Sequence, residues 1–265
     1  MRLHRPSVSA VAAVLVSSLG IVAYHHTARA NSAPASQASS VVHDAAASGP
    51  GRSSAATVPP GTTASPRPEI PTRLPGLGPT TLSHVPADAR QVVLVTGAAR
   101  DSASSKAVLY QRVDGGWRPG PVWAAHNGYK GWTDDHHAGD LRSPIGVFGL
   151  TDAGGRLADP GTELPYHRSR AFSAGGSGFE GEPLAGSFDY VVAINYNRRP
   201  GTSPMDGAKP MGANRGGGIW IHVDHGGPTH ACVSLSRTHM KQLLRALDPA
   251  AHPVVVMGDA ASLAR

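Results

Sequence analysis

Short apolar segments rich in valine and isoleucine recur along the later part of the chain, separated by turns that contain glycine. Segments of this length and composition predict β-strands. Asp114-Gly115-Gly116 is typical of a β-hairpin, and Asp152-Ala153-Gly154-Gly155 predicts a second turn. The predicted strands cover residues 91–96, 107–113, 122–125, 146–150, 190–195, 219–223 and 253–257.

One helix is predicted near the C-terminus. Ser236 is a suitable N-cap, and Pro249 ends the helical pattern. Between them lies an apolar stripe with helical spacing, which we expect to pack on the sheet. The stripe consists of Met240, Leu243, Leu244 and Leu247. The pattern therefore predicts a mainly β domain with one C-terminal helix and long loops at 127–142 and 159–187. Loops of this length are more often functional than idle.

The N-terminal part predicts export followed by a tether. Residues 1–30 combine a basic start, an uncharged apolar stretch and Ala28-Arg29-Ala30, the pattern of a cleaved signal peptide or an uncleaved N-terminal anchor. Residues 31–81 are dominated by Ala, Ser, Pro, Thr and Gly and predict a disordered linker. The folded domain is then expected over residues 82–260.

Composition excludes several classes of protein. Charged residues make up only 16% of the chain, which disfavours a helical bundle, and the single cysteine excludes an intramolecular disulfide framework. The net charge of +6 contains no dense Lys/Arg run, so no nucleic acid partner is expected. The Gly-x-Gly-x-x-Gly run at 176–181 follows no predicted strand and precedes Pro183, so it predicts no nucleotide cofactor.

The candidate chemistry lies between Ile219 and Ser236. Cys232 is an odd thiol in an exported chain, and His222 lies ten positions earlier, before a tight loop that contains Gly226 and Gly227. A neighbouring imidazole can stabilise a thiolate nucleophile, which predicts thiol catalysis. Two other interpretations stay open. The site could be inert, or zinc could bind His222, His225, His230 and Cys232.

Other polar and aromatic loop residues have weaker interpretations. His136-His137 beside Asp134 and Asp135 are interpreted as solvated loop residues rather than metal ligands. Four loop aromatics could shape a substrate groove or anchor the loops on the sheet. They are Trp132, Tyr166, Phe172 and Phe179.

Two signatures together resemble the L,D-transpeptidase (YkuD-type) catalytic domain. Thr229-His230-Ala231-Cys232 is similar to the Ser/Thr-His-Gly-Cys turn of that family, and the segment ending in His222 resembles the strand before it. Upstream, the family signature Gly-Asp-x-Arg-Thr-Pro-x-Gly-x-Phe is similar to the run from Gly139 to Phe148. The resemblance spans roughly residues 126–258 and implies an L,D-transpeptidase-like β-sandwich or barrel.

The resemblance also implies roles. Cys232 would be the nucleophile, His222 its base and His230 a supporting residue, with oxyanion and substrate contacts at Ala231, Thr229, Ser234 and Gly227. The implied substrate is a peptidoglycan tetrapeptide stem. A thioester forms, D-Ala leaves, and an amine of a neighbouring stem gives a third-to-third-residue cross-link. The protein would act outside the cytoplasm at the cell wall, without cofactor, metal or obligate protein partner, and would contact the membrane only through an uncleaved N-terminal segment.

Three departures from the family pattern keep alternatives open. Ala231 replaces glycine, Ser234 replaces the usual Arg or Asn, and the loop after His222 is short, which makes His225 an alternative base. An alanine at a backbone position that needs positive φ would cost about 1 kcal/mol. The alternative functions are an L,D-carboxypeptidase that uses water, a sortase-like transpeptidase, and a non-catalytic wall-binding module.

Overall fold

A computed structural model describes residues 70–265. The predicted export segment and residues 31–69 of the predicted linker lie outside the described residues. Residues 70–81 belong to the fold, because Leu74 is 3% exposed and α1 (Pro79–Ser83) begins before the predicted boundary. The Gly78 amide donates to the carbonyl of Leu263 at 2.9 Å. Within residues 70–265, no helix has both the length and the apolar character needed to span a bilayer.

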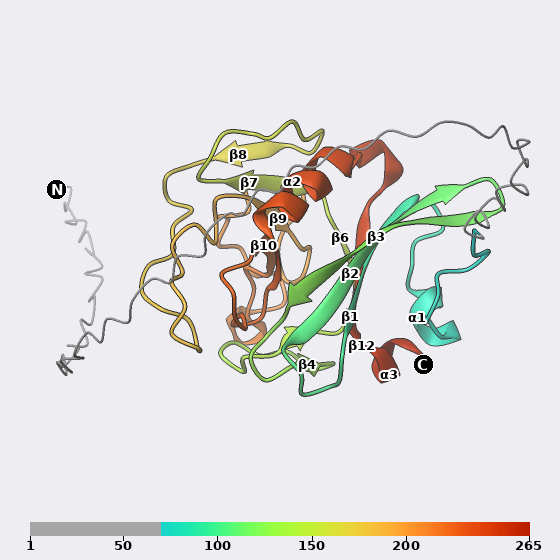
Figure 1. The fold of residues 1–265 in the computed structure, drawn as a ribbon, viewed down its shortest axis with the longest axis horizontal. Helices are drawn as coiled ribbons and strands as arrows, with labels where there is room; N and C mark the ends of the chain where they lie inside the picture. Colours follow the sequence, from blue (N-terminus) through green and yellow to red (C-terminus); the bar gives the residue numbers. More distant parts are fainter. Residues whose placement is uncertain (1–69) are drawn as a thin grey trace, which may run out of the picture. The chain divides into compact units, whose positions relative to one another are not determined.

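The fold is built on a ten-stranded sheet with the order β6-β12-β1-β2-β3-β11-β10-β9-β7-β8 (Figure 1). A separate pair consists of β4 (Trp132–Thr133) and β5 (Ser143–Pro144). The strands of the large sheet are β1 (Gln91–Gly97), β2 (Ser104–Val113), β3 (Gly116–His126), β6 (Gly146–Gly149), β7 (Asp152–Gly155), β8 (Tyr166–Arg168), β9 (Val191–Ala193), β10 (Trp220–Val223), β11 (Val233–Leu235) and β12 (Val254–Asp259).

The sheet curls because strands near its two ends are adjacent in the chain. β6 is the first strand in the sheet order and β7 is the ninth, yet only Leu150 and Thr151 join them. The Asn195 amide, just after β9, also donates to the carbonyl of Gly149 in β6 at 3.0 Å. Leu150 is fully buried in the core that this curl encloses. The prediction of a mainly β fold is confirmed.

The predicted helix is α2 (Arg237–Ala246), which contacts β10 and β11. The hydroxyl of Ser236 accepts a hydrogen bond from the His239 amide at 3.2 Å, so the predicted N-cap is confirmed. All four residues of the predicted stripe are buried: Met240, Leu243, Leu244 and Leu247. Three further short helical segments were not predicted, namely α3 (Ala260–Leu263), η1 (Ala213–Arg215) and η2 (Pro249–Ala251), in addition to α1.

One predicted turn is a strand. Residues 152–155 form β7, which pairs with β9 through Asp152 and Ala193 and with β8 through Ala153 and Tyr166. All four residues are buried, so neighbouring strands supply the stabilisation that a glycine-rich sequence lacks on its own. By contrast, the hairpin turn between β2 and β3 is confirmed, with Gly115 at a φ of 85°.

Candidate active site

Cys232 lies immediately before β11, beside the parallel strand β10. Val233 pairs with Ile221, which sets Cys232 next to Trp220. The Trp220 amide donates to the Cys232 Sγ at 3.5 Å, and the thiol donates to the carbonyl of Gly218 at 3.7 Å. Cys232 as a whole residue is intermediate in exposure.

The thiol opens into a small cavity of about 120 Å³. Four of the predicted site residues line it, together with the alternative base and with residues of the loop that precedes β9. The structure therefore gathers most of the predicted chemistry at one place. The lining consists of Ala174, Leu184, Ser187, Phe188, His222, His225, Thr229, His230 and Cys232.

His222 is held as a neutral imidazole. Its ring is 3% exposed, and its Nδ1 lies 2.9 Å from the carbonyl of Val223. Because a carbonyl only accepts, Nδ1 carries the proton and Nε2 keeps its lone pair. Burial lowers the pKa of His222 to about 4, against the opposing effect of the Val223 hydrogen bond. At neutral pH His222 is thus in the form that a general base requires.

The thiol of Cys232 is also neutral at rest. Burial raises its pKa to about 11, and the Trp220 amide offsets only part of that shift. Among the described residues, the hydrogen bonds of Sγ go to Trp220 and Gly218 and none goes to a histidine ring. The expectation of a thiolate stabilised by a neighbouring imidazole is therefore wrong for the free protein. No preformed ion pair between Cys232 and a histidine is therefore seen among the described residues.

The two sequence signatures meet at the backbone of this turn. The hydroxyl of Ser143, from the upstream signature, donates to the carbonyls of Ala231 at 2.7 Å and Cys232 at 3.3 Å. Thr229 donates to the same Cys232 carbonyl at 2.6 Å. In the described part of the chain, the amides of Ala231 and Cys232 make no turn or loop hydrogen bond to the backbone, which leaves them as candidate oxyanion donors.

Ala231 fits this turn without strain. Its φ is not positive, so the replacement of the family's glycine carries no left-handed penalty at this position. The concern raised by the sequence is thereby removed.

Of the residues predicted to contact substrate or oxyanion, Ser234, Gly227 and Ala231 are not among those that line the cavity. Ser234 is fully buried, and its hydroxyl donates to the Asp224 carboxylate at 2.7 Å. Gly227 is buried against the side chain of Glu182, and a Cβ at this glycine would overlap the carboxylate. Both residues shape the surroundings of the cavity instead of lining it.

Sequence reasoning missed two carboxylate–imidazole pairs. His126 Nδ1 lies 2.8 Å from Asp224, whose hydrogen bond raises the pKa of His126. Burial opposes ionisation of Asp224, but His126 and Ser234 outweigh it and lower its pKa to about 2. The second pair joins His225 Nδ1 to Glu182 at 3.1 Å. Neither pair has a local sequence signal, because the partners are 98 and 43 positions apart.

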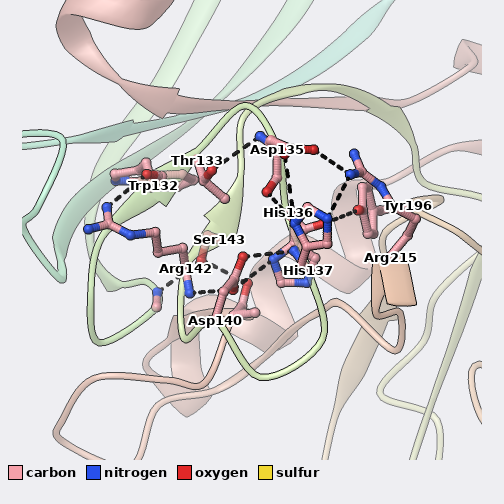
Figure 2. Close-up of polar contacts among 12 residues, drawn as sticks. Trp132, Thr133, Asp135, His136, His137, Asp140, Arg142, Ser143, Tyr196 and Arg215 are labelled. Atoms are coloured by element: carbon pink, nitrogen blue, oxygen red, sulfur yellow. Dashed lines mark hydrogen bonds and ion pairs between the residues drawn. The ribbon is translucent and has the colours of Figure 1, made fainter. Parts of the chain in front are cut away.

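The loop before β6 is held by hydrogen bonds and ion pairs, within the loop and to Tyr196 and Arg215 (Figure 2). His136, expected to be solvated, is instead 4% exposed, and its Nδ1 lies 3.0 Å from Asp140. Arg215 pairs with Asp135, and Arg142 donates to Asp101 at 2.7 Å and to the carbonyl of Trp132 at 3.1 Å. Across residues 70–265, no group of three or more His, Cys, Asp or Glu side chains could hold a metal ion.

The loop aromatics divide between anchors and surface. Trp132 and Phe172 are 0% and 1% exposed and anchor their loops, and Tyr166 donates its hydroxyl to the Leu157 carbonyl. Phe179 is 37% exposed, and its ring centroid lies 4.9 Å from that of His230 at the cavity. Phe179 is thus the most exposed of the four, and it lies beside His230, which lines the cavity.

The profile of the L,D-transpeptidase catalytic domain (YkuD) matches residues 123–256. The chain belongs to this family. The match contains both signatures, including the turn at 229–232, and all of the residues that line the cavity. The family assignment indicates an L,D-transpeptidase-type domain whose relatives act on the cell wall.

Two solved structures are similar to the chain at a low level. They are "the helical cell shape determining protein Pgp2 from Campylobacter jejuni" and "Bdellovibrio bacteriovorus Bd1075". Each has a TM-score of 0.38 and 18% identity, and each match covers 64% of this chain and 48% of the other. The chain thus spans about half the length of these proteins. No curated protein sequence matches it significantly.

Proposed function

We propose that the protein is an exported L,D-transpeptidase that acts on peptidoglycan tetrapeptide stems. The observation that carries the proposal is a cavity lined by the thiol of Cys232 and by His222, whose Nδ1 donates to a carbonyl and leaves Nε2 free. The backbone amides of Ala231 and Cys232 are the proposed oxyanion donors. The family assignment supports the substrate class.

In the proposed acylation, His222 takes the thiol proton as Sγ attacks the carbonyl of the third stem residue. The oxyanion that develops accepts hydrogen bonds from the amides of Ala231 and Cys232, a contribution of about 3–4 kcal/mol in comparable sites. The imidazolium then protonates the amine of D-Ala as the C–N bond breaks. Because the pKa of His222 is lowered to about 4, its protonated form is a strong acid toward that leaving amine.

The thioester is resolved by an amine from a neighbouring stem, which regenerates the thiol and forms the third-to-third-residue cross-link. We further propose that residues 1–30 direct export and that the tether over 31–69 lets the domain act within the wall. Water as acceptor would make the same site an L,D-carboxypeptidase.

The test is digestion of tetrapeptide muropeptides by the full chain, followed by mass analysis of free D-Ala and of dimers. The proposal expects D-Ala and cross-linked dimers in amounts that depend on Cys232, with none from Cys232→Ala. Release of D-Ala without dimers would favour the carboxypeptidase. Binding to muropeptides without any product would indicate a wall-binding module and contradict the proposal.

A further inference from the structure

A second imidazole at the cavity is oriented by a carboxylate. Glu182, in the loop between β8 and β9, places its Oε1 at 3.1 Å from the Nδ1 of His225. Its Oε2 accepts from the Glu180 amide at 2.8 Å. Burial opposes ionisation of Glu182, but the backbone amides of Glu182 and Glu180, together with His225, hold its pKa below the usual value. Nδ1 of His225 therefore faces an anion, and Nε2 is left for another partner.

Two glycines from different segments make room for this carboxylate. A Cβ at Gly178, in the loop between β8 and β9, would overlap the Oε1 of Glu182, and so would a Cβ at Gly227, between β10 and β11. The loop also closes on itself, since the Gly178 amide donates to the Glu182 carbonyl at 2.8 Å. The side chains of His225 and Glu182 are only 5% and 11% exposed, so the pair is enclosed.

His225 shares the cavity with Cys232 and lies beside His222. The two imidazole rings are nearly parallel, with centroids 5.9 Å apart and an interplanar angle of 14°. They differ in the partner of Nδ1, which is a carbonyl for His222 and a carboxylate for His225. The carboxylate at Nδ1 fixes that nitrogen of His225 as the donor, so Nε2 carries the lone pair that a base requires.

We propose that His225 is the base that deprotonates the acceptor amine in the second half-reaction, and that Glu182 is its positioning residue. The inference rests on the proposed transpeptidase function. It assigns the acceptor to the class of primary ammonium groups, which are protonated at neutral pH and must lose a proton before attack.

The proton balance of this step is complete. His225 Nε2 takes one proton from the ammonium group, and the neutral amine attacks the thioester carbonyl. As the C–S bond breaks, the second amine proton passes through His222 to Sγ, which leaves as the thiol. The amide bond is formed, and His225 releases its proton to water.

The experiment measures acylation and resolution separately in the full chain. Intact mass after rapid quenching follows the acyl-enzyme formed from a tetrapeptide donor, first alone and then with a stem amine or hydroxylamine as acceptor. Hydroxylamine is neutral at pH 7, so it needs no deprotonation before it attacks the thioester. We expect Glu182→Gln and His225→Gln to lower the ratio of stem-amine to hydroxylamine resolution rates at least tenfold.

The matched control is Arg237→Gln. Arg237 pairs with Asp189 at 2.6 Å and so anchors the end of the same loop without lining the cavity. The proposal expects this variant to keep the wild-type ratio. An equal fall of the ratio in Arg237→Gln would assign the effect to loop anchoring and overturn the proposal.

The remaining outcomes separate this inference from the function on which it rests. Acyl-enzyme that forms normally, with a wild-type ratio in Glu182→Gln and His225→Gln, overturns the role of His225 and leaves the transpeptidase intact. A wild-type protein that never forms acyl-enzyme overturns both.

Discussion

Two histidine sites beside the β10–β11 pair have opposite electrostatics. His222 is buried and donates to a backbone carbonyl, and its pKa is lowered to about 4. His126 is about one-third exposed and faces the Asp224 carboxylate at 2.8 Å, which raises its pKa. The comparison shows that burial and the hydrogen-bond partner, rather than residue type, decide whether the pKa of an imidazole is lowered or raised.

This difference separates a chemical site from a structural one. A neutral imidazole beside a thiol can accept a proton, whereas the His126–Asp224 pair, closed by the Ser234 hydroxyl, joins the end of β3 to β10 and β11. Four substitutions and one titration test this account, from the largest expected effect to the smallest.

The largest difference is expected between His222→Gln and His126→Gln. The first removes the general base, so the acylation rate should fall about 10²–10⁴-fold. The second removes a partly exposed ion pair, so acylation should stay within a few-fold of wild type. Acylation is measured as the rate of mass increase with a carbapenem-type β-lactam. Wild-type acylation by His222→Gln would transfer the role of base to His225.

The lowered pKa of His222 should make the unfolding free energy depend on pH. Its folded pKa is lowered from the unfolded value of 6.5 to about 4, so the unfolded state binds the proton first as the pH falls. Wild type should lose about 2.5 kcal/mol of unfolding free energy between pH 7.5 and 4.5 relative to His222→Gln.

His126 gives the opposite sign, because its pKa is raised and its contribution to stability is lost as the pH rises through that pKa. The pKa of Asp224 is lowered from 3.8 to about 2, so its contribution is intact above that interval and is lost as the pH falls through it. Urea unfolding across this pH range measures both trends. Parallel pH profiles for wild type and His222→Gln would contradict the burial of a neutral His222.

Ser143→Ala should cause the next largest loss of unfolding free energy. The Ser143 hydroxyl is fully buried, donates to the Ala231 and Cys232 carbonyls and accepts from the Gly128 amide at 2.9 Å. Its loss leaves buried groups unpaired and should cost about 2 kcal/mol, with slower acylation because the oxyanion amides lose their support. Urea unfolding and β-lactam acylation of the same sample measure both effects. A variant with wild-type stability would show that the two signatures are not coupled through this hydroxyl.

Ala231→Gly should have the smallest effect. Because the φ of Ala231 is not positive, glycine gains nothing here and only adds freedom to the unfolded chain, so stability should fall by less than about 1 kcal/mol. A variant that is more stable than wild type would contradict the unstrained turn.

The sequence predicted features that are encoded locally. The hairpin at Gly115, the cap at Ser236 and the valine-rich strands depend on neighbouring residues, and the structure confirms them. β7 was missed because its four residues are held in place by partners distant in sequence. The motif around Cys232 and His222 predicted where the cavity lies. It did not predict the protonation states of the thiol and the imidazole.

What the sequence could not show depends on burial and on distant partners. The raised pKa of Cys232 follows from the desolvation of a side chain whose surroundings come from several segments. Glu182 and Asp224 acquire their roles through partners far along the chain. Neither the desolvation of a side chain nor the identity of a distant partner can be predicted from a local sequence pattern.

The most direct measurement is the mass of the full chain quenched in acid shortly after mixing with a tetrapeptide stem. The account predicts an added tripeptide acyl group with one equivalent of D-Ala released, mapped by peptide digestion to Cys232 and absent from Cys232→Ala. Release of D-Ala at the wild-type rate by Cys232→Ala, or an adduct on any other residue, would contradict it.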